Sequence, residues 1–263
     1  MDAMPSAPLA GRVVLVTGVS RRRGIGHAVA RRLGGMGAGL FVTHHRAHDE
    51  AQPWGADDLS AVLGSLREAA PRVADLAADL ADPGAPEAVV EAAVAAYGHV
   101  DALVCVHARS GSDGPLSALD PAWLDAHWQV DARSTLLLTR HFAAQHDGRP
   151  GGRVVWFGSG QHLGPMPSEV AYTAAKGALI GALPTVAAEL AERGILLNAV
   201  NPGPVDTGHL PPKEDFPGFD VAFPLGRYGA PDDAARLVAW LVSDEGAWMA
   251  GQHLSTEGGF RRG

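Results

Sequence analysis

Short apolar runs alternate with amphipathic segments along most of the chain. The runs cover 12–17, 39–43, 73–77, 102–106, 153–157 and 195–200, and each has the length and residue types of a buried parallel strand. Between them, helical spacing of apolar residues recurs at 26–33, 86–97, 121–145, 172–192 and 231–242. This alternation predicts βαβ units, and therefore an α/β fold with a parallel sheet covered by helices on both faces.

One segment interrupts the pattern. Residues 202–224 are rich in proline and glycine and contain no regular apolar period. Such a segment is typical of a surface loop, and we expect it to form a lid over a substrate. The chain has neither an internal repeat nor a low-complexity linker, so we expect residues 1–263 to form a single domain.

Composition and charge narrow the function classes. The chain has 263 residues, is 46% hydrophobic and carries a net charge of -8, which argues against a nucleic-acid partner. Cys105 is the only cysteine, so an intrachain disulfide is impossible. No signal-peptide pattern and no continuous apolar run of membrane-spanning length is found. We therefore expect a cytoplasmic protein with no membrane partner.

A glycine-bearing turn joins the first strand to the first helix. Thr17 and Gly18 end the strand, and Gly24, Ile25 and Gly26 open the helix. Glycine lets the backbone approach a pyrophosphate, and free N–H groups at a helix start favour an anion. The same glycines also occur in ordinary strand–helix turns, but their place after the first strand of a βαβ series favours a dinucleotide site.

The residues near the expected adenosine ribose indicate which dinucleotide is preferred. An acid at the end of the second strand would accept hydrogen bonds from a free 2′-hydroxyl and repel a phosphate. That strand ends in Thr43, His44, His45 and Arg46, and the next acid is Asp49. Arg46 and one or more of the residues Arg21, Arg22 and Arg23 are candidates to bind a 2′-phosphate, the alternative being that they are solvated loop residues. NADP(H) is favoured over NAD(H).

Three residues form a candidate reactive centre. Tyr172 and Lys176 lie four apart in a helical segment and so share one face. A nearby ammonium favours the phenolate, so we expect Lys176 to lower the pKa of Tyr172. Ser159 follows the fifth apolar run, at the sheet edge where α/β folds bind ligands. A serine there can hydrogen-bond a substrate carbonyl while the tyrosine supplies a proton.

The serine, the Tyr-x-x-x-Lys pair and the glycine turn together resemble the short-chain dehydrogenase/reductase family, in particular members similar to 3-oxoacyl-carrier-protein reductase. The resemblance covers nearly the whole chain, although the turn from Thr17 to Gly26 is two residues longer than the family's T-G-x-x-x-G-x-G. It implies a single doubly wound (Rossmann) domain with about seven strands, the last near 251–254. It also implies a homotetramer or homodimer formed through the helices near 121–146 and 171–191.

By this resemblance Ser159 orients a ketone, Tyr172 donates the proton, and Lys176 holds the cofactor ribose. The resemblance further implies that cofactor contacts extend to residues after the other strands. With the turn, the full candidate set is Gly18, Ser20, Arg21, Arg22, Arg23, Gly24, Ile25, Gly26, Arg46, Asp79, Leu80, His107, Tyr172, Lys176, Pro202, Gly203, Val205 and Thr207. No metal site is predicted.

The chain departs from the family pattern in two places. Cys105, Val106, His107 and Ala108 replace the family's Asn-Asn-Ala-Gly, and we interpret His107 as a structural histidine or a replacement hydrogen-bond donor. Asp131 stands where an asparagine completes the family's catalytic group of four. Its carboxylate would stabilise charged Lys176 and oppose a tyrosinate, so we expect a lower pH optimum in an Asp131→Asn variant.

The sequence therefore predicts an NADP(H)-dependent oxidoreductase that reduces a moderately apolar ketone to a secondary alcohol, or catalyses the reverse. A non-redox dehydratase or cyclase on the same fold is the first alternative, favoured by the two departures from the family pattern. A cofactor-binding regulator with little turnover is the second, although a regulator has no need of an intact serine, tyrosine and lysine.

Overall fold

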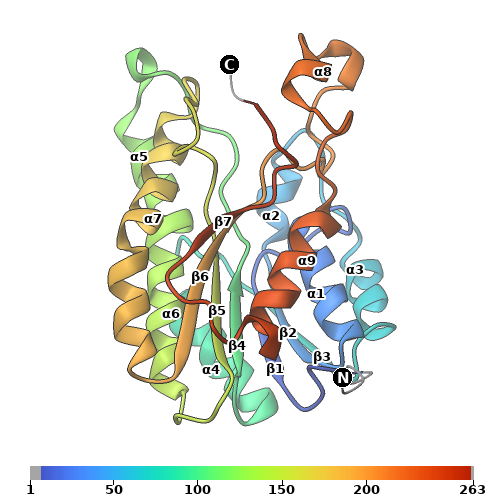
Figure 1. The fold of residues 1–263 in the computed structure, drawn as a ribbon, viewed down its shortest axis with the longest axis vertical. Coiled ribbons are helices and arrows are strands. Elements are labelled where there is room, and N and C mark those ends of the chain that lie inside the picture. Colours follow the sequence, from blue (N-terminus) through green and yellow to red (C-terminus); the bar gives the residue numbers. More distant parts are fainter. Residues whose placement is uncertain (1–6, 262–263) are drawn as a thin grey trace.

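The computed structural model describes residues 7–261 and contains a parallel β-sheet of seven strands in the order β3-β2-β1-β4-β5-β6-β7. Figure 1 shows helices covering both faces of this sheet. The doubly wound α/β fold predicted from the sequence is confirmed. The strands are β1 (Val13–Val16), β2 (Gly39–His44), β3 (Val73–Ala77), β4 (Ala102–Cys105), β5 (Gly152–Phe157), β6 (Ile195–Asn201) and β7 (His253–Ser255).

Helices follow most strands, as parallel crossovers require. They are α1 (Ile25–Gly35), α2 (Arg46–Glu50), α3 (Leu59–Arg67), α4 (Ala85–Tyr97), α5 (Pro121–His127), α6 (Ser134–Gln145), α7 (Val170–Ala191), α8 (Phe219–Ala222) and α9 (Pro231–Val242). Helices α1, α3 and α9 bury their apolar faces on one side of the sheet, and α4, α6 and α7 on the other.

The central strands are buried on both faces, which explains their continuous apolar sequence. Successive residues of β1 point to opposite layers: Val14 and Val16 pack with α1 and α9, whereas Leu15 packs with the other layer. In β5, Trp156 is fully buried and its indole Nε1 donates a hydrogen bond to Thr139 Oγ1 at 2.9 Å. The strand order reverses between β1 and β4, and open α/β sheets bind ligands at such a point.

Three local features differ from the sequence prediction. The helix expected over 121–145 is interrupted by a π-helical stretch, Trp128–Arg133, between α5 and α6. Helices α2 and α3 occupy a region for which we had predicted no element. The 202–224 segment contains α8, whose Phe219 and Phe223 are buried against Phe216, Tyr228 and Phe260 in an aromatic cluster.

Among the described residues, α7 alone is long and apolar enough to cross a membrane by length and composition. A core helix meets the same criterion, so the finding is weak evidence for a membrane span. One face of α7 packs against β6 and the π-helical stretch, and Leu179 and Leu183 are buried there.

Candidate active site

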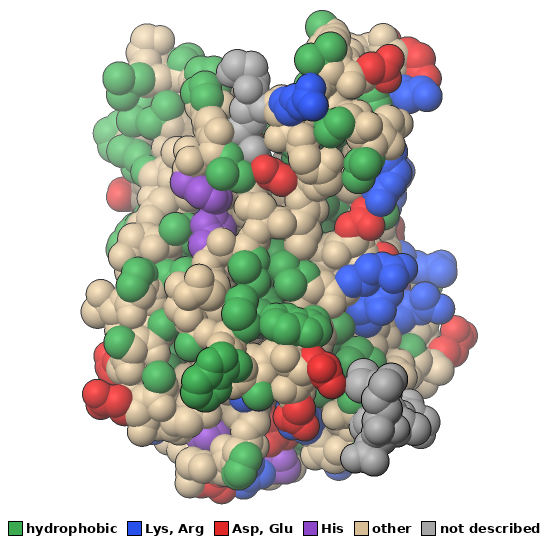
Figure 2. Space-filling model, in the orientation of Figure 1, with side chains coloured by type: hydrophobic (Ala, Val, Ile, Leu, Met, Phe, Trp, Pro, Cys, Tyr) green, Lys and Arg blue, Asp and Glu red, His purple; other side chains and the backbone are tan. Residues whose placement is uncertain are grey.

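A cavity of about 470 Å³ lies at the edge of the sheet where β1, β3, β4 and β6 end. Its volume suits a small organic ligand. Figure 2 shows the molecule hollowed at its upper end, between the side carrying α5 and α7 and the lobe carrying α8. The cavity brings together many of the predicted cofactor-binding residues: Gly18, Ser20, Arg21, Gly24, Ile25, Gly26, Asp79, Leu80, His107 and Thr207.

Other predicted cofactor residues lie outside the lining of this cavity. Arg22 and Arg23 line a separate groove over α1 and α3. Arg46, exposed at the start of α2, forms an ion pair with Glu50 at 2.9 Å. Four arginines were predicted to contact the cofactor, and the structure places only Arg21 of the four at the cavity. The side chains of Arg22 and Arg23 face the separate groove, and that of Arg46 pairs with a neighbouring acid. The other predicted cofactor residues outside the cavity lining follow β6 or belong to the reactive centre: Pro202, Gly203, Val205, Tyr172 and Lys176.

The glycine turn is too closely packed to accept side chains. Gly18 has φ +74°, and a Cβ there would lie 2.8 Å from the Cα of His107. A Cβ on Gly26 would lie 2.3 Å from the carbonyl oxygen of Gly18. Helix α1 begins after Gly24 without a side-chain cap, so its first N–H groups are available to a ligand. These features fit the pyrophosphate of a dinucleotide.

Arg21 links the turn to two distant segments. Its Nη2 donates to the carbonyl oxygen of Thr207 at 2.6 Å, and its Nε lies 3.5 Å from the Asp49 carboxylate. Its guanidinium lies over the Trp54 ring, 5.1 Å from the centroid, and Trp54 contacts His209. Trp54 and His209 also line the cavity, and the sequence analysis missed both.

Arg109 is a second arginine at the cavity that the sequence analysis missed. It follows β4, and its Nε is buried without a hydrogen-bond partner. His48 of α2 also lines the cavity, and its pKa is lowered by burial and by the nearby Arg109 guanidinium. Two cationic guanidinium groups therefore face a cavity whose ligand is expected to be an anion.

The predicted reactive residues converge beside this cavity. Ser159 lies two residues beyond β5. Its Oγ lies 3.9 Å from Met166 Sδ and is close enough to Tyr172, in the first turn of α7, to influence the pKa of the phenol. Lys176, one turn further, is 2% exposed and donates from Nζ to the carbonyl oxygen of Phe157 at 3.0 Å. Its Nζ lies 5.8 Å from the centre of the Tyr172 ring. The structure thus brings Ser159, Tyr172 and Lys176 together.

The electrostatics of Tyr172 differ from our expectation. Burial raises the pKa of its phenol well above the ordinary value, and the Asp131 and Glu169 carboxylates raise it further, while the nearby Ser159 hydroxyl acts to lower it. Burial also lowers the pKa of Lys176, partly offset by Asp131. The structure does not show the lowered pKa that we predicted for Tyr172, because burial and the two acids act in the opposite direction.

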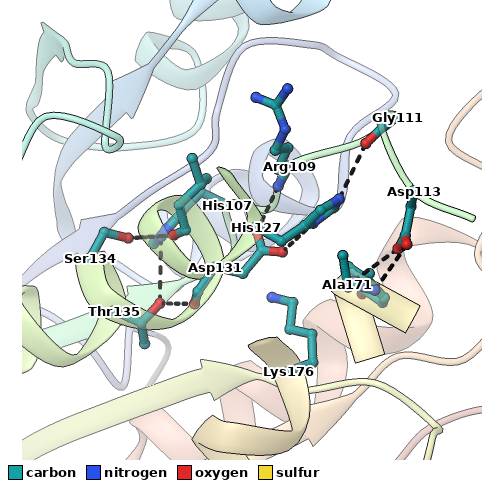
Figure 3. Close-up of polar contacts among 12 residues, drawn as sticks. His107, Arg109, Gly111, Asp113, His127, Asp131, Ser134, Thr135, Ala171 and Lys176 are labelled. Atoms are coloured by element: carbon teal, nitrogen blue, oxygen red, sulfur yellow. Dashed lines mark hydrogen bonds and ion pairs between the residues drawn. The ribbon is translucent and has the colours of Figure 1, made fainter. Parts of the chain in front are cut away.

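A residue far away in the sequence caps the start of α7. Asp113 accepts a hydrogen bond from the backbone N–H of Ala171 at 2.9 Å, as Figure 3 shows, and a second from the backbone N–H of Tyr172 at 2.8 Å. Burial opposes ionisation of Asp113, but these bonds and one from Gly114 lower its pKa overall. Because α7 has no side-chain cap of its own, Asp113 fixes the turn that carries Tyr172.

Asp131 lies in the π-helical stretch and is completely buried. One carboxylate oxygen accepts from the backbone N–H of Arg109 at 2.7 Å, and the other lies 3.0 Å from His127 Nδ1. His127 precedes Asp131 by four residues, or about one helical turn, and was not among the residues predicted from the sequence.

The contacts of His107 are those expected of a structural histidine, because both ring nitrogens lie within hydrogen-bond distance of buried hydroxyl groups. Its Nδ1 lies 2.6 Å from Thr17 Oγ1 and its Nε2 lies 2.7 Å from Ser134 Oγ. Burial, with the Lys176 charge, lowers its pKa to about 4, so the ring is neutral at physiological pH. Within residues 7–261, no group of three or more His, Cys, Asp or Glu side chains is arranged to hold a metal ion.

Comparison with known proteins agrees with this geometry. A family model described as enoyl-(acyl carrier protein) reductase matches residues 18–261. An uncharacterised oxidoreductase of Bacillus subtilis, YjdA, is 37% identical, covering 96% of this chain and 98% of its own. The trihydroxynaphthalene reductase PfmaI of Pestalotiopsis fici is 30% identical, and the match covers 98% of this chain and 94% of the relative.

A solved structure supports the same assignment. The short-chain dehydrogenase of Burkholderia cenocepacia in complex with NADP is 33% identical, has a TM-score of 0.81, and covers 96% of this chain and 98% of its own. Sequence, fold and the family model agree over nearly the whole chain. The protein is an oxidoreductase that belongs to the short-chain dehydrogenase/reductase family.

Proposed function

We propose that this oxidoreductase uses NADP(H) to reduce a ketone to a secondary alcohol, or to catalyse the reverse. The observation that carries the proposal is the convergence of three side chains: the Ser159 hydroxyl lies close to the Tyr172 phenol, and the Nζ of buried Lys176 lies 5.8 Å from the centre of the Tyr172 ring. This group stands at the sheet edge, next to the glycine-lined cavity. Titration with NADPH followed by cofactor fluorescence, and then addition of a panel of ketones, tests it: binding without consumption of nicotinamide would contradict the reductase.

The cavity residues would hold the cofactor. N–H groups at the start of α1 suit its pyrophosphate, and Asp79 and Leu80 suit the adenine end, while Thr207 lines the cavity beside Arg21. Pro202, Gly203 and Val205, which follow β6, complete the proposed nicotinamide side. Bound cofactor supplies or accepts the hydride.

The chain's own residues manage the proton. A raised pKa keeps the Tyr172 phenol protonated at neutral pH, so it can donate to a developing alkoxide. Ser159, whose hydroxyl lies close to this phenol, can donate to the same carbonyl oxygen and orient it. Lys176 uses one of its three N–H donors on Phe157, which leaves two for ribose hydroxyls or for Tyr172.

The preference for NADP(H) rests on Arg21. It lines the cavity, and the acid nearest to it, Asp49, is engaged by Arg21 itself and by Trp54. A 2′-phosphate placed beside the guanidinium would gain a charge-assisted hydrogen bond. The NADP complex of the Burkholderia relative agrees with this preference.

Replacing Arg21 by Ala is expected to weaken NADPH binding by about 10- to 100-fold, the value of one or two charge-assisted hydrogen bonds. NADH binding should change by less than about threefold, because NADH has no 2′-phosphate. The control is Arg22→Ala, which removes a neighbouring arginine outside the cavity. Equal losses for both cofactors in Arg21→Ala would exclude a role in 2′-phosphate recognition.

We propose a moderately apolar ketone as the substrate and the 202–224 segment as its lid. The aromatic cluster of Phe216, Phe219, Phe223 and Tyr228 gives this lid an apolar interior. Segments 110–116 and 161–168 also reach the reactive centre, since Asp113 binds the backbone N–H of Tyr172 and Met166 contacts Ser159. The reductase PfmaI, whose name specifies a trihydroxynaphthalene substrate, makes bicyclic aromatic ketones sensible first compounds for the panel.

We propose a cytoplasmic homotetramer or homodimer formed through the 121–146 and 171–191 helices. The exposed face of α7 carries small residues, among them Ala174, Gly181 and Ala188, which allow another helix to approach closely. Gly181→Arg is expected to shift sedimentation velocity toward smaller species, whereas Ala96→Arg on exposed α4 should not. Unchanged sedimentation of Gly181→Arg would exclude the α7 face from the interface.

A further inference from the structure

His127 stands between two oxygen atoms inside the protein. Its Nδ1 lies 3.0 Å from Asp131 Oδ2, and its Nε2 lies 3.2 Å from the carbonyl oxygen of Gly111, as Figure 3 shows. His127 is 1% exposed and Asp131 is 0% exposed, so water cannot replace these contacts. A carbonyl oxygen only accepts hydrogen bonds, and Nε2 must therefore carry a hydrogen.

The contact with Asp131 then fixes the charge of the pair. With a hydrogen already on Nε2, a neutral imidazole has only a lone pair at Nδ1. A lone pair facing a carboxylate at 3.0 Å would be repelled, so a further proton lies between Nδ1 and Oδ2. The net charge of the pair is zero whether the histidine or the aspartate holds that proton. An asparagine in place of Asp131 would be equally neutral.

Charged and titratable groups face this pair from several elements. From α7 and the residue before it come Tyr172, Lys176 and Glu169. Asp113 belongs to the loop after β4, and His107 and His48 approach from the cavity side. The proximity of His127 acts to lower the pKa of both Asp113 and Glu169, so its influence extends to the start of α7. The ring also packs edge-on against Tyr172, with centroids 6.0 Å apart.

We propose that His127 is a positioning residue which neutralises and orients Asp131, so that the pair replaces the neutral asparagine of the family beside Tyr172 and Lys176. The inference rests on the proposed function and assigns it a residue outside the serine, tyrosine and lysine. Without His127, a bare buried carboxylate would face the phenol and disfavour the tyrosinate. With His127 present, Tyr172 can therefore lose its proton at a lower pH than it could beside an unpaired Asp131 carboxylate.

The test compares four proteins: wild type, Asp131→Asn, His127→Gln and the double variant. Glutamine is chosen for the histidine because its side chain keeps a hydrogen-bond donor while the titratable ring is removed. Alcohol oxidation is followed from about pH 6 to pH 10.5 with saturating NADP⁺, because the positive nicotinamide ring would lower the pKa of a nearby phenol into this range. This direction needs Tyr172 deprotonated, so its rate falls as pH drops below the apparent pKa. His141→Gln, at a surface His–Glu contact on α6, is the matched control.

In His127→Gln the apparent pKa of kcat/KM should rise by about one unit, so that activity at low pH falls about tenfold. Activity on the high-pH plateau should recover to near wild type, which structural damage alone would not allow. Adding Asp131→Asn to His127→Gln should reverse the shift, whereas Asp131→Asn alone should lower the apparent pKa only slightly. His141→Gln should follow the wild-type profile.

If Asp131→Asn shifted the apparent pKa of kcat/KM equally in the wild type and in His127→Gln, the inference would be overturned, while the proposed reductase function would stand. Absence of any NADP-dependent turnover in the wild type would overturn the proposed function instead. The shared proton can be tested without turnover, by ¹⁵N NMR of the imidazole near neutral pH, with His127 assigned from His127→Gln. Either a doubly protonated ring or a protonated Asp131 carboxyl supports the pair, and finding neither overturns it.

Discussion

Tyr172→Phe is expected to lower kcat for ketone reduction by about 10³-fold, within the range usual for loss of a positioned proton donor. The Ser159 hydroxyl lies close to the phenol, so both hydroxyls can reach the same carbonyl oxygen, and phenylalanine keeps the ring without the hydroxyl. NADPH affinity should stay within about threefold, because Tyr172 is not in the lining of the cofactor cavity. Single-turnover oxidation of bound NADPH measures the effect.

Tyr97→Phe is the matched control, because it removes a phenol hydroxyl that donates to the carbonyl oxygen of Leu40, far from the reactive centre. We expect a small loss of stability, about 1 kcal/mol, and unchanged kcat. A Tyr172→Phe enzyme that still reduces ketones at near wild-type rate would remove the phenol from the mechanism. Loss of a dehydration or cyclisation activity without any change of nicotinamide would favour the non-redox alternative.

Gly26→Ala should abolish measurable NADPH binding and lower the free energy of unfolding by about 1 to 3 kcal/mol, the usual cost of overpacking. The added methyl would lie 2.3 Å from the carbonyl oxygen of Gly18, so the turn or the start of α1 must move. The N–H groups proposed for the pyrophosphate would move with it. Isothermal titration with NADPH and thermal unfolding measure the two effects.

Gly35→Ala provides the control within the same helix. Gly35 has no atom of another segment within 4 Å of its added methyl, so the substitution should stabilise α1 by about 0.5 to 1 kcal/mol. NADPH affinity should remain unchanged. If Gly26→Ala bound NADPH as tightly as Gly35→Ala does, the turn would have no role in holding the pyrophosphate.

The order of strands and helices was predictable because burial of a parallel sheet leaves a strong mark on the sequence. The runs at 39–43 and 195–200 correspond to β2 and β6 within one residue at each end. The π-helical stretch was not predictable, since 121–145 has the spacing of one continuous helix and a single extra residue per turn does not alter that pattern. Helices α2 and α3 were missed because they are short and half-exposed.

The candidate site was predictable where a motif coincides with a strand end, as for Gly18 and Ser159, or with a helix start, as for Tyr172. It was not predictable where long-range contacts decide. Adjacent arginines in the turn look alike in the sequence, yet only Arg21 meets Thr207 and Asp49. Similarly, nothing in the sequence pairs Asp113 with an amide 59 positions away, or predicts that His127 will face Asp131 across a widened helical turn.

The carboxylate of Asp113 also bears on how new specificities are acquired on this scaffold. Loops at the sheet edge are the segments most readily exchanged between relatives, and 110–116 flanks the proposed substrate site. Here one such loop carries the anchor for the backbone of Tyr172, and a second bond from Val170 to Gly114 reinforces it. A transplanted loop that lacks an acid at this position would therefore change the alignment of the proton donor together with the substrate it selects.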